Sequence, residues 1–71
     1  MAVYRQLALC QRLRRMRIET ERTQKQVADF MGISQAAYSR LEKGEIEVTI
    51  QKLWMLSEFY KVGVDTMLRD I

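Results

Sequence analysis

Residues 23–44, TQKQVADFMGISQAAYSRLEKG, contain the start and end signals of two short helices. Thr23 is followed three residues later by Gln26, which is the capping-box pattern of a helix N-terminus. Ser34 is a favourable N-cap for a second helix. Gly32 and Gly44 follow the two segments, at the position where a left-handed C-terminal residue favours glycine. The pattern therefore predicts two short helices joined by a tight turn, the second covering residues 35–43.

The rest of the chain also predicts helices rather than strands. No proline interrupts it, and its β-branched residues do not alternate with polar ones as they would in a half-buried strand. Apolar spacing predicts further helices over residues 3–19, 49–61 and 64–68, with Gly63 as a third left-handed terminus before the last. The apolar positions are Leu9, Cys10, Leu13, Met16, Val27, Ala28, Met31, Ala37, Tyr38, Leu41, Ile50, Leu53, Trp54, Leu56, Phe59, Tyr60, Val64, Met67 and Leu68. We expect the hydroxyl of Tyr38 to reach the edge of this core.

Length and composition restrict the class of protein. Seventy-one residues, 48% of them apolar and 30% charged, predict one small globular domain over residues 1–71. Cys10 is the only cysteine and histidine is absent, which excludes an internal disulfide and a zinc site built from Cys and His. The commonest acid–base catalyst is missing too. We therefore expect no metal, no cofactor and no enzymatic activity.

The sequence also bears on location. No apolar run approaches the ~20 residues needed to span a bilayer. The N-terminal stretch is a poor signal peptide, because an arginine interrupts its apolar patch and no small-residue cleavage site follows. We expect no membrane contact and a cytoplasmic protein.

The charge is unevenly distributed. Residues 1–43 carry nine Lys and Arg against four Asp and Glu, a net of +5, and residues 44–71 carry three against five, a net of −2; together these give the overall +3. A basic segment followed by an acidic one favours a polyanion on one face and a different partner on the other. The other possibility is an asymmetry that arose by chance.

The two short helices match a known recognition unit in their lengths and turn. Two helices joined by a short glycine-bearing turn form a helix-turn-helix, whose second helix enters the major groove of DNA. The outward residues predicted for that helix suit this task, because glutamine can pair with adenine and arginine with guanine. The other possibility is an ordinary solvated helix face.

The same stretch resembles the phage-repressor family of the Cro-like, xenobiotic-response-element type. The resemblance extends from Leu13 to Leu68 and leaves about the first nine residues outside. It implies an all-α, compact five-helix lambda-repressor-like domain in which residues 1–9 extend the first helix and residues 23–43 form the helix-turn-helix. The residues that carry it are Gln24, Ala28, Gly32, Ile33, Ser34, Ser39, Arg40, Glu42 and Gly44.

The resemblance also implies roles for individual residues. The base-reading positions are Gln35, Ala36, Ser39 and Arg40, and the phosphate-contacting positions are Thr23, Gln24 and Lys43. Gln24 would also brace Gln35, and Arg17 would form a structural salt bridge with Glu42. Three arginines, Arg5, Arg12 and Arg15, form a polar stripe on the first helix, which is ordinarily solvated; of these we take only Arg12 as a phosphate candidate.

Two features depart from the family pattern. The link Glu45-Ile46-Glu47-Val48 has two carboxylates where the family often has phosphate-binding lysines. The fourth helix adds apolar residues beyond the needs of a small core: Trp54, Met55, Phe59 and Val62. An N-terminal extension through Val3, Tyr4 and Leu7 could cover them. We favour a dimer interface, because aromatic residues and methionine are enriched in such patches and a domain this small has little core of its own.

These observations predict a sequence-specific regulator of transcription that binds double-stranded DNA. The resemblance implies that it is bacterial or phage-encoded and associated with the nucleoid. We expect a homodimer that places two recognition helices on the half-sites of a pseudo-palindromic operator. The alternative is a protein-interaction module, such as an antitoxin, that binds a partner protein through its C-terminal half.

Overall fold

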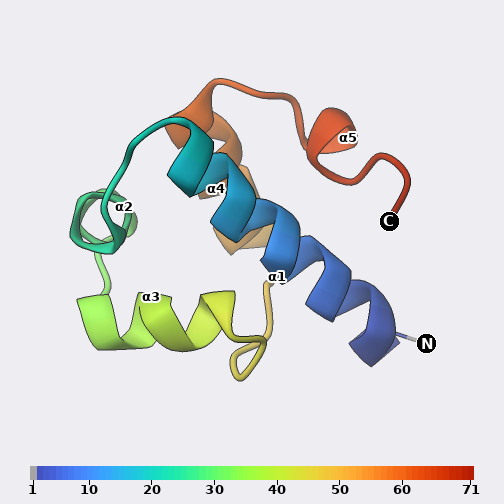
Figure 1. The fold of residues 1–71 in the computed structure, drawn as a ribbon, viewed down its shortest axis with the longest axis horizontal. Coiled ribbons are helices and arrows are strands. Elements are labelled where there is room, and N and C mark those ends of the chain that lie inside the picture. The colour runs from blue at the N-terminus through green and yellow to red at the C-terminus, as the bar shows by residue number, and fades with distance from the viewer. Residues whose placement is uncertain (1) are drawn as a thin grey trace.

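The computed structural model describes residues 2–71, with side chains from residue 6 onward, and these residues form five helices and no strand. They are α1 (Ala2–Glu19), α2 (Gln24–Met31), α3 (Gln35–Glu42), α4 (Ile50–Tyr60) and α5 (Val64–Met67). α2 packs against α3 and α4, and α1 packs against α3 and α5 (Figure 1). The all-α, five-helix fold predicted from the sequence is confirmed.

The start signals predicted for α2 and α3 act as expected. The Thr23 hydroxyl accepts a hydrogen bond from the Gln26 backbone N–H at 3.0 Å, and the Gln26 side-chain oxygen accepts one from the Thr23 N–H at 2.8 Å. This reciprocal pair is a complete capping box. The Ser34 hydroxyl accepts from the Ala37 N–H at 3.0 Å. Both helices therefore begin where their caps satisfy otherwise unpaired backbone donors.

Two glycines end these helices in the left-handed conformation. Gly32 has φ 73° and Gly44 has φ 82°. After Gly44 the Glu45 N–H donates back to the Arg40 carbonyl at 2.9 Å, which closes the turn at the end of α3. A side chain at position 44 would also meet Leu7 of α1, because a Cβ there would lie 2.5 Å from Leu7 Cδ2, whereas a Cβ at Gly32 would meet nothing.

The end of α4 differs from the prediction. Lys61 takes the left-handed conformation, with φ 57°, whereas Gly63 has φ −61° and stands at the N-cap of α5. The prediction of a left-handed helix terminus at Gly63 was therefore wrong. The reason is local: the Ser57 carbonyl accepts from the Val62 N–H at 3.1 Å and the Ser57 hydroxyl donates to the Val62 carbonyl at 2.6 Å. These bonds close the turn two residues earlier than the glycine.

The core lies where the helices converge. Its buried members are Leu9, Cys10, Leu13, Val27, Ala28, Met31, Tyr38, Leu41, Leu53, Leu56 and Met67. Three of the predicted apolar positions are instead exposed: Ile50, Trp54 and Leu68. Tyr38 is fully buried and its hydroxyl oxygen is inaccessible to solvent, so the expectation that it would reach the edge was wrong.

The N-terminal residues continue α1 as one helix instead of folding back over α4. Leu7 lies against Gly44, and the Gln6 side-chain oxygen accepts from the Val48 N–H at 3.3 Å. This part of α1 therefore runs beside the link between α3 and α4. The side chains of Val3, Tyr4 and Arg5 lie outside the described residues.

Alanine at the two left-handed glycines should separate backbone strain from steric contact. We expect Gly32→Ala to lower the free energy of unfolding by about 1 kcal/mol, the usual cost of a left-handed conformation for a residue with a Cβ. Gly44→Ala should cost more, because its Cβ also meets Leu7. Urea unfolding of both variants measures the difference. The extra cost at position 44 should shrink in a Leu7→Ala background, and an unchanged cost would rule out the contact with Leu7.

Candidate nucleic-acid interface

The outer face of α3 carries the residues predicted to read bases. Gln35, Ala36 and Arg40 are exposed and Ser39 is half-buried, whereas Tyr38 and Leu41 on the opposite face belong to the core. α3 lies along one edge of the molecule, with α2 beside its first turn (Figure 1). This polar helix face is therefore open to a large partner.

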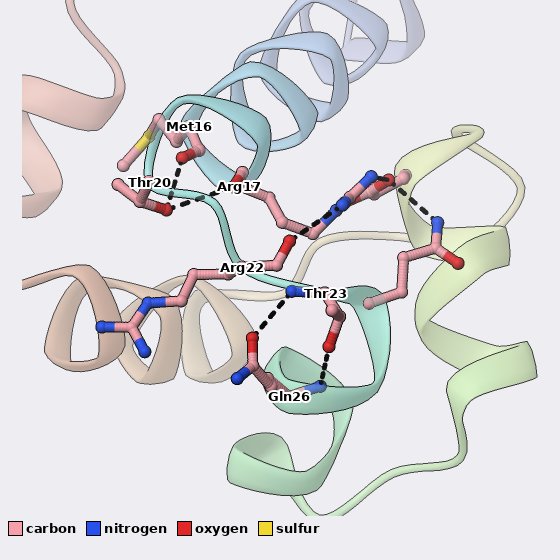
Figure 2. A network of polar contacts seen from close by, with 8 residues as sticks. Met16, Arg17, Thr20, Arg22, Thr23 and Gln26 are labelled. Atoms are coloured by element: carbon pink, nitrogen blue, oxygen red, sulfur yellow. Dashed lines mark hydrogen bonds and ion pairs between the residues drawn. The ribbon is translucent and has the colours of Figure 1, made fainter.

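A buried ion pair fixes α3 against α1. Arg17 Nε donates to Glu42 Oε2 at 2.7 Å and Arg17 Nη2 donates to Glu42 Oε1 at 3.3 Å, so the guanidinium binds the carboxylate with two nitrogens. The side chains are 14% and 2% exposed. Arg17 Nη1 also donates to the Arg22 carbonyl at 3.0 Å, which holds the loop between α1 and α2 (Figure 2). The pair expected from the family resemblance thus joins α1, this loop and α3.

Gln24, at the start of α2, completes this network. Its side-chain nitrogen donates to Glu42 Oε1 at 3.1 Å. Among the described residues no hydrogen bond joins Gln24 to Gln35, so the brace implied by the resemblance is absent and Gln24 supports Glu42 instead. The first turn of α2 is thereby tied to the last turn of α3.

The network keeps both charged groups ionised. Burial on its own would raise the pKa of Glu42, but the hydrogen bonds to its carboxylate, of which that from Arg17 is the strongest, outweigh burial and hold the pKa below its ordinary value. The hydrogen bond to Glu42 in turn raises the pKa of Arg17. Because Glu42 has its lowered pKa only in the folded protein, its contribution to stability is present above its unfolded pKa. That contribution is lost as the pH falls through the folded pKa.

Arg12 lies away from the α3 surface. Arg12 Nη1 donates to the Met67 carbonyl at 3.1 Å and also to the Arg69 carbonyl. These are carbonyls at and just after the end of α5, where a cation is favourable. The structure therefore gives Arg12 a role in joining α1 to the C-terminal segment, and the phosphate contact predicted for it stays a prediction.

Arg40 has a partner that the sequence did not indicate. Its Nε lies 3.4 Å from Glu45 Oε1, and the two side chains are 60% and 53% exposed. From the sequence, Glu45 was interpreted only as part of an acidic link. The signal that could have shown the pair is the turn at Gly44, because it brings the next residue back beside the last turn of α3.

The predicted apolar patch of α4 is mostly part of the core margin. Met55, Phe59 and Val62 are half-buried and pack against the core. The Phe59 ring lies 5.1 Å from that of Phe30 and 5.0 Å from that of Tyr60, with the Arg22 guanidinium carbon 5.3 Å from its centroid.

Only Trp54 of the four predicted patch residues is exposed, at 61%. One turn before it lies Ile50, which is 71% exposed and was not assigned to the patch from the sequence. The exposed apolar surface of α4 therefore comprises Ile50 and Trp54.

Residues 2–71 contain neither a candidate membrane span nor a candidate metal site. No helix in this range is long and apolar enough to cross a membrane. No group of three or more Cys, Asp or Glu side chains in the described part of the chain is placed to hold a metal ion. The exposed face of α3 is the candidate site.

The fold and this face define a helix-turn-helix protein: α2 and α3 are short, meet at a left-handed glycine and leave the outer face of α3 open. A helix-turn-helix family model matches residues 13–67, and the chain belongs to this family. The membership predicted from the sequence is confirmed.

One relative among curated proteins bears on function. The chain is 36% identical over 59 residues to an uncharacterized HTH-type transcriptional regulator, YobD, of Bacillus subtilis (strain 168). The match covers 83% of this chain and 53% of that protein, so the chain spans about half the length of its relative. No solved structure gives a significant match.

Replacing Glu42 should reveal the ion pair through its pH dependence. We expect Glu42→Gln to lower the free energy of unfolding at neutral pH by about 3–5 kcal/mol, because it leaves Arg17 largely buried without its counter-charge. The deficit should narrow as the pH falls and Glu42 of the wild type becomes protonated. Urea unfolding between neutral and acid pH measures both effects.

Asp29→Asn is the matched control for this comparison. Asp29 pairs with Lys25 at 3.0 Å on the surface of α2, where both side chains are well exposed. Its neutralisation should cost less than about 0.5 kcal/mol. Gln24→Ala, which keeps the ion pair, provides a milder test if Glu42→Gln does not fold. A deficit independent of pH in the Glu42 variant would show that the carboxylate charge does not support the fold.

Proposed function

We propose that this protein is a sequence-specific DNA-binding regulator of transcription, with α3 as its recognition helix. The observation that carries the proposal is the exposed polar face of α3, held rigid from behind by the buried pair of Arg17 and Glu42. The similarity to a protein named as an HTH-type transcriptional regulator supports it. The major groove admits one helix and presents a code of donors and acceptors to it.

The side chains of α3 suit distinct contacts. Gln35 and Ala36 begin the helix, where recognition helices meet base edges, and Arg40 lies further along the same exposed face. Ser39, between them in the sequence, is half-buried and can reach the groove with its hydroxyl. We assign these four residues to base reading: glutamine suits adenine, arginine suits guanine, and alanine suits a thymine methyl group.

The ends of the two helices suit the DNA backbone. Thr23 and Lys43 are exposed, and Gln24 is half-buried. An amide nitrogen carries two donor hydrogens, so Gln24 can bind Glu42 with one and a phosphate with the other. Phosphate contacts at both ends would fix the position of α3 in the groove without selecting a base.

We also propose that the protein acts as a homodimer. A single domain with few phosphate contacts binds weakly at physiological salt, and two linked domains bind far more tightly. Ile50 and Trp54 give α4 an exposed apolar surface that a second copy could cover, with Met55, Phe59 and Val62 at its margin. The rival occupant is a different protein, in which case the chain is an interaction module.

Selection from random DNA duplexes tests the DNA-binding proposal. We expect enrichment of a pseudo-palindromic sequence at moderate salt. Against that sequence, Arg40→Ala should lose about 1–3 kcal/mol and relax the preference at one base pair, whereas Lys43→Ala should weaken binding to all sequences evenly and reduce the salt dependence. No enriched sequence would overturn the proposal, and an even loss for Arg40→Ala would make Arg40 a phosphate contact.

Sedimentation tests the homodimer. We expect Trp54→Glu to give folded monomers, because a charge in a dimer interface is costly to desolvate. Ile18→Glu is the matched control, since Ile18 is comparably exposed on α1 and should leave the oligomer unchanged. A Trp54→Glu variant that remains dimeric would reject the interface on α4. A wild-type protein that sediments as a monomer would reject the homodimer and favour the rival partner protein.

A further inference from the structure

The backbone at the end of α3 holds Glu45 beside Arg40. Gly44 takes φ 82°, and the Glu45 N–H then donates to the Arg40 carbonyl at 2.9 Å. This hydrogen bond fixes the Cα of Glu45 over the last turn of the helix. The link continues to Val48, whose N–H is bound by the Gln6 side chain of α1. The position of Glu45 is therefore set by the fold, independently of its own side chain.

The side-chain contact is electrostatic and loose. Arg40 Nε and Glu45 Oε1 are 3.4 Å apart, without a hydrogen bond, and both side chains are more than half exposed. By contrast, Arg17 and Glu42 approach to 2.7 Å and are almost fully buried. A carboxylate that held an arginine in place for contact with a base would resemble the tight Arg17–Glu42 pair. The Arg40–Glu45 pair places a carboxylate beside the Arg40 guanidinium without a hydrogen bond to hold it there.

We propose that Glu45 competes with DNA for the guanidinium of Arg40 and so lowers the affinity of each subunit for its operator. The inference rests on the proposed function, since it concerns the base-reading residue of α3. When α3 enters the groove, Arg40 leaves Glu45 for a base edge. The carboxylate then remains close to the phosphates, which repel it.

Glu47 distinguishes this competition from simple charge repulsion. It lies in the same link, is also exposed, and among the described residues its carboxylate has no ion-pair partner. Glu47→Gln removes the same charge from nearly the same place without freeing Arg40. Its effect therefore measures the general repulsion between the link and DNA.

The experiment compares Glu45→Gln and Glu47→Gln on the selected operator, in the wild-type and Arg40→Ala backgrounds. Both are isosteric changes of exposed side chains, and thermal unfolding checks that both variants remain folded. We expect Glu47→Gln to tighten binding modestly and Glu45→Gln to tighten it about two- to fivefold further, the range typical of an exposed ion pair. In the Arg40→Ala background the two variants should bind equally.

Three results would overturn the inference while leaving the proposed function intact. Equal gains in affinity for Glu45→Gln and Glu47→Gln in the wild-type background would mean that Glu45 acts only by charge repulsion. Weaker binding by Glu45→Gln would mean that Glu45 positions Arg40 or contacts a base itself. If Glu45→Gln still binds more tightly than Glu47→Gln in the Arg40→Ala background, Glu45 acts on a group other than Arg40. If no operator is enriched at all, the proposed function fails and this inference fails with it.

Discussion

The buried ion pair between Arg17 and Glu42 is the constraint on which the arrangement of this small domain depends. A carboxylate with 2% exposure is tolerated only because the guanidinium and the amide of Gln24 bind both of its oxygens. Those partners come from α1 and from the first turn of α2. The direction of α3 is therefore set by a contact that only one relative placement of three helices satisfies, and the open outer face of α3 follows from it.

What the sequence predicted well was determined locally. The helix caps are contacts within one turn of chain: Thr23 with Gln26, and Ser34 with the N–H three residues later. The two glycines, Gly32 and Gly44, act through their own backbone conformation. The wrong prediction at Gly63 also concerns contacts within a few residues, but there hydrogen bonds from Ser57, and not the glycine, decide where the helix ends. A left-handed residue was required at Lys61, despite the strain for a residue with a Cβ, because Ser57 bonds to both the N–H and the carbonyl of Val62.

What the sequence could not predict depends on which elements meet. Periodicity placed Arg12 on a polar stripe, but only the fold shows that Arg12 reaches the end of α5. Periodicity also placed Phe59 among apolar residues, but it did not show that Phe30 and Arg22 enclose the Phe59 ring. Nor did it show that Trp54 remains exposed. The polar face of α3 was predictable because a helix that turns Tyr38 and Leu41 toward the core turns its opposite face to solvent.

The uneven charge of the chain has a structural meaning at the end of α3. Arg40 and Lys43 close the basic part of the sequence, and Glu45 and Glu47 begin the acidic part within a few residues, all of them exposed. The left-handed turn at Gly44 folds this boundary back on itself, so that opposite charges face each other instead of separating along the chain. Under the proposed function, a recognition helix whose Arg40 faces a carboxylate attracts DNA weakly in general. It gains most where a base offers Arg40 two acceptors, because only such a contact exceeds the loss of its carboxylate partner.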